Sequence, residues 1–259
     1  MSVVATPAFA PGPSLPRLFE VELRKTVDTR AGFWLLAASA LLAVAAAVLT
    51  LAFGAAGEQV FGIYFERTVG TVGVLLPVVG ILAVTSEWSQ RTAVTTFALV
   101  PRRERVIAAK LLAGLALALA SVGVCLVTSL AATALAPVVG QGAGAWDVAV
   151  SGLAGSVLFM AIWMLAGAAL GLLLMSSPAA IVASFLIPSG IYGLANGIPA
   201  FEPAARWIDL GTAADELNAG HPAISGHAWA HLAAGIAVWV IVPLALGLVR
   251  LRRSEVATS

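Results

Sequence analysis

The feature that most limits the fold of this chain is a set of long stretches without Asp, Glu, Lys or Arg. Five of them stand within the 259 residues, at 31–57, 68–86, 111–146, 148–201 and 217–249. A helix that crosses the hydrocarbon core of a membrane needs about 20 apolar residues. The stretches are about that long or longer, and the chain is 10% charged, against about 25% in soluble domains. We therefore predict an integral membrane protein.

The fourth stretch is long enough for two spans. Its break is expected at the MSSPAA segment (175–180), because Pro178 would leave a backbone carbonyl without a partner inside a helix. The predicted fold class is an all-α integral membrane protein with six transmembrane helices, and a six-span domain covers 31–250. The spans are expected at about 33–54, 69–86, 109–134, 149–175, 179–198 and 228–249.

The two ends of the chain differ from the spans. Residues 1–14 contain three prolines and no periodic pattern, so we predict a disordered tail, and 251–259 is predicted to be a cytoplasmic tail. Between the tail and the first span, 15–30 has apolar residues at helical spacing: Leu15, Phe19, Leu23 and Val27. This pattern predicts an amphipathic helix that lies in the membrane surface, and a soluble cytoplasmic helix is the alternative.

The positions of Lys and Arg predict the orientation. With a cytoplasmic N-terminus, all fourteen Lys and Arg residues except Arg67 and Arg206 fall on the cytoplasmic side, which leaves twelve there. We therefore expect both termini in the cytoplasm. No cleavable signal peptide is expected, because the first apolar run begins after residue 30 and is too long. The excess of Arg, Ala and Gly is typical of a GC-rich bacterial genome and hence of the plasma membrane.

Apart from Lys110 at the start of the third, the predicted spans contain no Asp, Glu, Lys or Arg, although ion-coupled carriers keep such groups inside the membrane as relays. The energy for transport is therefore expected to come from outside the bilayer. No phosphate loop is expected, because it needs glycines before a Lys that is followed by Ser or Thr: Lys25 is preceded by Arg24, and Lys110 is followed by Leu111. A separate subunit would have to hydrolyse the nucleotide.

The segment 86–112, between the second and third spans, contains an ordered set of polar residues. An acid ends the second span, a Thr follows, then Pro-x-Arg, then a Lys that opens the third span: Glu87, Thr92, Pro101, Arg103 and Lys110. This order resembles the permeases of the type-two export branch of ATP-binding cassette (ABC) transporters. The layout of the whole chain is similar to that family as well. Arg91 stands where many members have Gly.

The resemblance implies an interfacial N-terminal helix and a cytoplasmic coupling helix between spans two and three, which docks on a cytoplasmic ABC ATPase. The implied coupling residues are Glu87, Arg91, Thr92, Phe97, Pro101, Arg102, Arg103 and Lys110. The implied partners are two copies of the ATPase, which would hold ATP and Mg, a second permease that is either another copy of this chain or a similar chain, and membrane lipids. No cofactor, metal or nucleic acid is expected on this chain. It would export a lipophilic or amphipathic compound through substrate-binding residues that the sequence does not identify.

Three alternatives remain at this point. The charged segment could consist of ordinary positive-inside charges beside anionic lipid. The chain could be a sensing or scaffold protein that works with an ABC ATPase without transport. Segments around Ser189 and His231 resemble the serine and histidine motifs of rhomboid intramembrane proteases, but an acidic segment stands between them and we expect the two side chains to lie too far apart to react.

Smaller features give further expectations. Helix kinks or local unwinding are expected at Pro77, Pro188 and Pro243. Close helix contacts are expected at two pairs of glycines, Gly167 with Gly171 and Gly193 with Gly197. The loop 199–227 is expected to contain short helices, one of them capped by Thr212. Three histidines lie on the predicted outer side, where an aqueous rim is favoured over a metal site: His221, His227 and His231.

Overall fold

The computed structural model of the chain describes residues 13–89, 103–139, 142–147, 150–218 and 226–256. Six helices in this part of the chain are long and apolar enough to cross a membrane: Arg30–Phe53, Phe61–Glu87, Glu104–Leu135, Gly152–Leu174, Ser177–Gly197 and Gly226–Arg253. The predicted all-helical class with six helices of spanning length is confirmed. Most of the predicted disordered tail lies outside the described residues.

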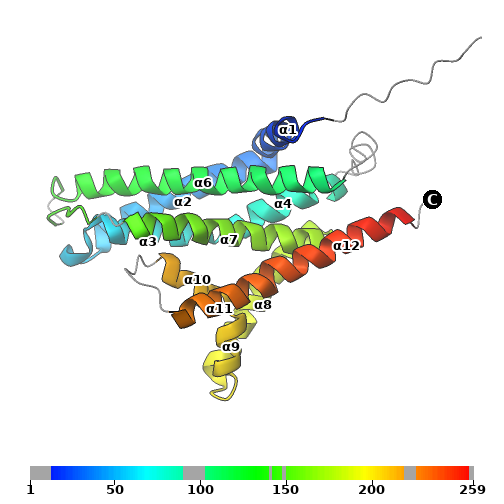
Figure 1. Cartoon of the computed structure of the whole chain (residues 1–259). Helices are drawn as coiled ribbons and strands as arrows, with labels where there is room; N and C mark the ends of the chain where they lie inside the picture. Colours follow the sequence, from blue (N-terminus) through cyan, green and yellow to red (C-terminus); the bar gives the residue numbers. More distant parts are fainter. Residues whose placement is uncertain (1–12, 90–102, 140–141, 148–149, 219–225, 257–259) are drawn as a thin grey trace, which may run out of the picture.

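The helices form one bundle with a helix across one end. The elements are α1 (Leu15–Asp28), α2 (Arg30–Phe53), η1 (Ala56–Glu58), α3 (Phe61–Gly73), α4 (Leu76–Ser89), α6 (Arg103–Leu135), α7 (Val150–Leu174), α8 (Ser177–Gly197), α9 (Glu202–Ile208), α10 (Leu210–Asn218), α11 (Gly226–Ile236), η2 (Ala237–Ile241) and α12 (Val242–Val256). Figure 1 shows α2, α6 and α7 running along the long direction of the bundle, whereas α1 lies across one end. The end of α4, the start of α6 and the end of α12 lie at this same end, which we call the α1 end.

The second span begins earlier than predicted. Its helix starts at Phe61, not near residue 69, so Glu66 and Arg67 lie inside it. The start is stable because Asp147 accepts a hydrogen bond from the Gly62 amide at 2.8 Å, which satisfies one of the unpaired amides of a helix N-terminus. Arg67 pairs with Glu58 at 2.9 Å, just outside the span. This hydrogen bond is the main reason why the pKa of Glu58 is lowered.

Two of the three prolines expected to disturb helices lie next to an irregular part of the helix. α3 ends at Gly73 and α4 begins at Leu76, directly before Pro77. Pro243 follows a π-helical turn, η2, which accommodates the carbonyl that proline leaves unpaired. Pro188 lies within α8, whose α-helical pattern continues through it.

One of the two glycine pairs brings helices together. A Cβ atom on Gly167 would lie 2.0 Å from the backbone oxygen of Pro77, and one on Gly171 would lie 3.2 Å from Ile81, so α7 and α4 touch through their backbones. This confirms the prediction for the first pair. Gly193 and Gly197 on α8 have no atom of the described chain within 4 Å of the added Cβ, so this pair brings α8 to no partner within the described residues.

The loop between α8 and α11 contains the short helices α9 and α10, as predicted. The cap of α10 differs from the prediction, because Asp209 accepts from the amides of Gly211 at 3.0 Å and Thr212 at 3.3 Å. A carboxylate just before the helix can accept from two amides, whereas Thr212 already lies within the first turn. The apolar face of α10 is buried, and the backbone oxygen of Leu217 would meet a Cβ on Gly155 of α7 at 2.3 Å. α10 is therefore packed into the bundle.

Candidate functional site

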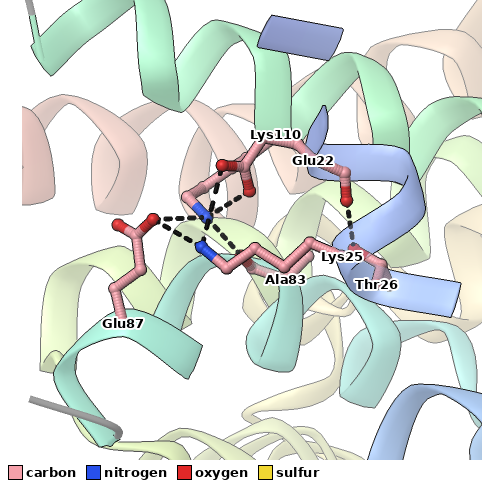
Figure 2. Close-up of polar contacts among 6 residues, drawn as sticks. All are labelled: Glu22, Lys25, Thr26, Ala83, Glu87 and Lys110. Atoms are coloured by element: carbon pink, nitrogen blue, oxygen red, sulfur yellow. Dashed lines mark hydrogen bonds and ion pairs between the residues drawn. The ribbon is translucent and has the colours of Figure 1, made fainter. Parts of the chain in front are cut away.

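Four charged side chains from three helices meet at the α1 end. α1 contributes Glu22 and Lys25, α4 contributes Glu87, and α6 contributes Lys110 (Figure 2). The Lys110 Nζ lies 2.5 Å from Glu22 Oε2 and 3.3 Å from Glu87 Oε1. The Lys25 Nζ lies 2.8 Å from Glu87 Oε1 and 3.8 Å from Glu22 Oε1. We call these four residues the ionic junction.

The ionic junction is buried and has no net formal charge. The side chains of Glu87 and Lys110 are 0% and 1% exposed, and that of Glu22 is 8% exposed. Lys25, at 29%, lies nearer the surface. A charge taken out of water costs several kcal/mol unless its partners are close and its hydrogen bonds are made. Each charge of the junction therefore depends on the others, and separating the three helices would leave buried charges without partners.

Local structure places the α1 residues at the junction. Glu22 and Lys25 are one helical turn apart, and the Thr26 hydroxyl donates to the Glu22 carbonyl oxygen at 2.9 Å on the same side of α1. Thr29 then caps α2 by accepting from the Gly32 amide at 3.2 Å. A Cβ on Gly32 would lie 1.7 Å from the Thr26 carbonyl oxygen. Glycine at this position therefore permits the tight turn by which α1 crosses the end of the bundle.

Two further features surround the junction. Lys110 also donates to the carbonyl oxygen of Ala83 at 3.2 Å, which leaves its ammonium well satisfied. Glu87 is less well satisfied, since its Oε2 is buried without a hydrogen-bond partner among the described residues. A hollow of about 220 Å³ lies beside the junction, and Glu22, Lys25 and Ser86 are among its lining residues.

Two of the eight predicted coupling residues belong to the junction. Glu87 and Lys110 lie on opposite sides of the segment 90–102 in the sequence, and the fold brings their charged groups together. Arg103 is the first residue of α6. The remaining five lie outside the described residues: Arg91, Thr92, Phe97, Pro101 and Arg102. Whether 90–102 forms a coupling helix stays a prediction.

Sequence reasoning missed the two α1 members of the junction. The predicted amphipathic helix 15–30 is defined by its apolar residues, and that pattern assigns no contact to Glu22 or Lys25. A signal was present, because Glu22, Lys25, Thr26 and Thr29 follow the i, i+3, i+4, i+7 spacing of one helix face. This polar stripe faces the bundle, while Leu15, Val21 and Val27 of the same helix are exposed.

The C-terminal helix is attached to the same end of the bundle. Arg252 of α12 pairs with Glu104 in the first turn of α6, and both side chains are exposed. Arg250 donates to the Leu173 carbonyl oxygen at the end of α7 at 2.6 Å. The α1 end thus gathers α1, α4, α6, α7 and α12 through polar contacts.

The residues of the rhomboid alternative are not brought together. His231 packs edge-on against Trp207, with ring centroids 4.7 Å apart, whereas Ser189 lines a separate pocket between α8 and α10. No hydrogen bond joins the two side chains in the described structure. His221 lies outside the described residues, and no group of three or more potential metal ligands occurs within them.

The contacts at the α1 end join helices that are far apart in the sequence. No protein-family model matches the sequence, and no curated protein matches it.

Proposed function

We propose that this chain is the membrane-spanning permease subunit of an ABC exporter. It would move a lipophilic or amphipathic compound out of the cytoplasm with ATP hydrolysed by a separate subunit. The observation that supports this proposal most directly is the ionic junction, which joins α1 to the two helices on either side of the segment 90–102. Six apolar helices of spanning length are consistent with such a subunit.

The junction suits a chain that receives force at one end. A partner that moves the segment 90–102 pulls on the end of α4 and on the start of α6. Because Glu87 and Lys110 are buried and paired, the two helix ends move together, and Glu22 and Lys25 make α1 follow them. Breaking this unit would cost about 3–5 kcal/mol for each stranded charge, which makes rigid-body motion the less costly response.

Contacts between α4 and α7 carry the motion further into the membrane part. The backbones of these two helices touch at Gly167 and Gly171, so they lack long side chains that could absorb a displacement. Movement of α4 would therefore shift α7 and the helices packed on it. In a pair of permease copies, with both termini in the cytoplasm and each copy bound to one ATPase, this shift would open a path toward the outside.

An ATPase as the source of energy agrees with the absence of a phosphate loop in the sequence. Two ion pairs stand near the ends of the second span. Glu87 pairs with Lys110 at the α1 end, and Arg67 pairs with Glu58 near the other end of the same span. Ion pairs of this kind fix helices in place, whereas a proton relay needs groups that change partners.

Site-specific photo-crosslinking tests the proposal. A photoreactive amino acid is introduced at Arg105, which is exposed at the start of α6, and in a second variant at Trp146, which is exposed near the opposite end of that helix. The chain is expressed in its native membrane. We expect the Arg105 variant to capture a protein with an ABC nucleotide-binding domain, and the Trp146 variant to capture none.

Function is then measured with the captured ATPase. Reconstituted together in liposomes, the two proteins should move a compound across the bilayer with ATP, and Lys110→Met should reduce this flux while ATP hydrolysis continues. Glu20→Gln, which removes an exposed ion pair of α1, is the matched control and should change neither rate. Capture of no ABC ATPase at Arg105 refutes the proposal, and a complex that hydrolyses ATP without flux supports a sensing or scaffold role.

A further inference from the structure

A second pocket lies among the helices, away from the ionic junction. It has a volume of about 240 Å³ and is bounded by the break between α3 and α4, by α7, by α8 and by α10. The break supplies small residues at its wall. A Cβ on Gly73 would lie 2.6 Å from the ring of Phe159, so glycine there lets that ring sit against the α3 backbone. We call this space the outer pocket, because α10 belongs to the predicted outer loop.

Aromatic rings form much of the wall of the outer pocket. Phe159 and Trp163 of α7 are stacked edge to face, with centroids 6.2 Å apart and an interplanar angle of 71°. Phe185 of α8 lines the same space. Ring faces attract cations as well as apolar groups, and the attraction grows when water is excluded. The wall is therefore suited to an apolar body that bears a positive charge.

The charged residue in this lining is Asp215 of α10. Ser184 also lines the pocket, but its hydroxyl already donates to the Ile181 carbonyl oxygen at 2.8 Å. The pKa of Asp215 is raised above its usual value, first because the protein around it partly desolvates the carboxyl group, although the residue as a whole is exposed, and then because the negative charges of Asp209 and Glu66 lie nearby. A bound cation would relieve this repulsion.

We propose that the outer pocket binds an organic cation, a quaternary or protonated ammonium attached to an apolar body. The ammonium pairs with Asp215, and the apolar body lies against Phe159, Trp163 and Phe185. This rests on the proposed function and adds the substrate class to it. The same chemistry occurs in free lipophilic amines and in choline headgroups of lipids, and the experiment separates the two sources.

The test measures binding to the full chain alone, without ATP or an ATPase. Purified protein in phosphatidylglycerol nanodiscs is dialysed to equilibrium against labelled phenyltrimethylammonium, and against benzenesulfonate as an anion of similar size. Empty nanodiscs give the background. We expect saturable binding of the cation and none of the anion. A repeat in phosphatidylcholine nanodiscs identifies the source, because a weaker apparent affinity there assigns the site to choline headgroups and an unchanged affinity assigns it to free amines.

Variants locate the binding in the outer pocket. Asp215→Asn removes the charge with little change in shape and should raise the Kd for phenyltrimethylammonium at least about tenfold. Trp163→Leu should raise it about twofold to thirtyfold. Glu216→Gln is the matched control, since it removes the neighbouring acid on the same helix, which does not line the pocket, and it should leave the Kd unchanged.

Three outcomes would overturn the proposal: no saturable binding of the cation, equal binding of the anion, or an unchanged Kd in Asp215→Asn. The charge selectivity of the wild-type chain keeps the test valid if a variant does not fold. Failure here leaves the crosslinking result at Arg105 untouched. If the chain binds the cation but no ABC ATPase is captured at Arg105, the cation site stands and the proposed permease function fails.

Discussion

Replacing Lys110 with methionine is expected to reduce the free energy of unfolding by about 3–5 kcal/mol. Methionine keeps most of the volume of the lysine stem and removes the ammonium, so the effect reports on charge more than on packing. Lys110 is 1% exposed and lies 2.5 Å from Glu22 and 3.3 Å from Glu87. At an effective dielectric constant of about 20, each of these attractions is on the order of 5–7 kcal/mol before the cost of desolvation is subtracted.

The size of this loss of stability depends on which partners Glu22 and Glu87 keep after Lys110 is replaced. Lys25 stays 2.8 Å from Glu87 but 3.8 Å from Glu22, so Glu87 keeps a close partner and Glu22 loses its nearest one. One buried carboxylate is then left poorly compensated, which places the expected loss near the lower end of the range. Adding Glu22→Gln to Lys110→Met should recover part of the loss, with a coupling of about 1 kcal/mol or more in the double-mutant cycle.

The assay is equilibrium unfolding in mixed micelles with increasing dodecyl sulfate, followed by tryptophan fluorescence and helical circular dichroism. The matched control is Glu20→Gln, because Glu20 and Arg24 form an ion pair of similar length, 2.7 Å, on the same helix. Their side chains are 59% and 73% exposed, and an exposed pair of this kind is worth about 0.5 kcal/mol or less. If Lys110→Met and Glu20→Gln cost the same, or if the cycle is additive, the junction does not hold the helices together.

Three more predictions concern stability, each measured as the thermal midpoint in detergent. Gly167→Ala should reduce the stability by about 1–3 kcal/mol, because its Cβ would press on the α4 backbone. Gly193→Ala should be neutral or stabilising, because its Cβ would meet no atom. Equal effects of the two variants would contradict the contact between α4 and α7. Gly32→Ala should be at least as costly as Gly167→Ala, since its Cβ would overlap a backbone oxygen at the turn between α1 and α2, and a neutral result would refute that turn. Asp215→Asn should raise the midpoint at neutral pH, and Glu216→Gln should not. Because the pKa of Asp215 is raised in the folded state, its carboxyl group lowers the stability of the protein increasingly as the pH rises from the ordinary carboxyl pKa through the raised value. The gain from Asp215→Asn should therefore vanish on acidification, and a gain that persists in acid would contradict this reasoning.

The sequence anticipated part of the site. The resemblance to ABC permeases implies Glu87 and Lys110 as coupling residues, and the structure puts their charged groups 3.3 Å apart. Their partner Glu22 was missed because it is 88 residues from Lys110, and a charge in an amphipathic helix normally faces water. The second span begins earlier than the uncharged stretch 68–86 predicts, because Glu66 and Arg67 lie inside a helix that begins at Phe61.

The number of long helices and their helical state were determined by the sequence alone. A backbone in hydrocarbon must satisfy its own hydrogen bonds, so a long uncharged stretch can only be a helix there, whatever surrounds it. Which faces of those helices pack together was decided by the tertiary structure. A spanning helix is apolar on its lipid side and on its protein side, so its sequence does not distinguish the two sides. Gly167 and Gly193 both belong to small-xxx-small pairs, but only Gly167 lies in a tight helix contact. The ionic junction and the outer pocket depend on those faces, and both appear only when helices far apart in the sequence are placed side by side.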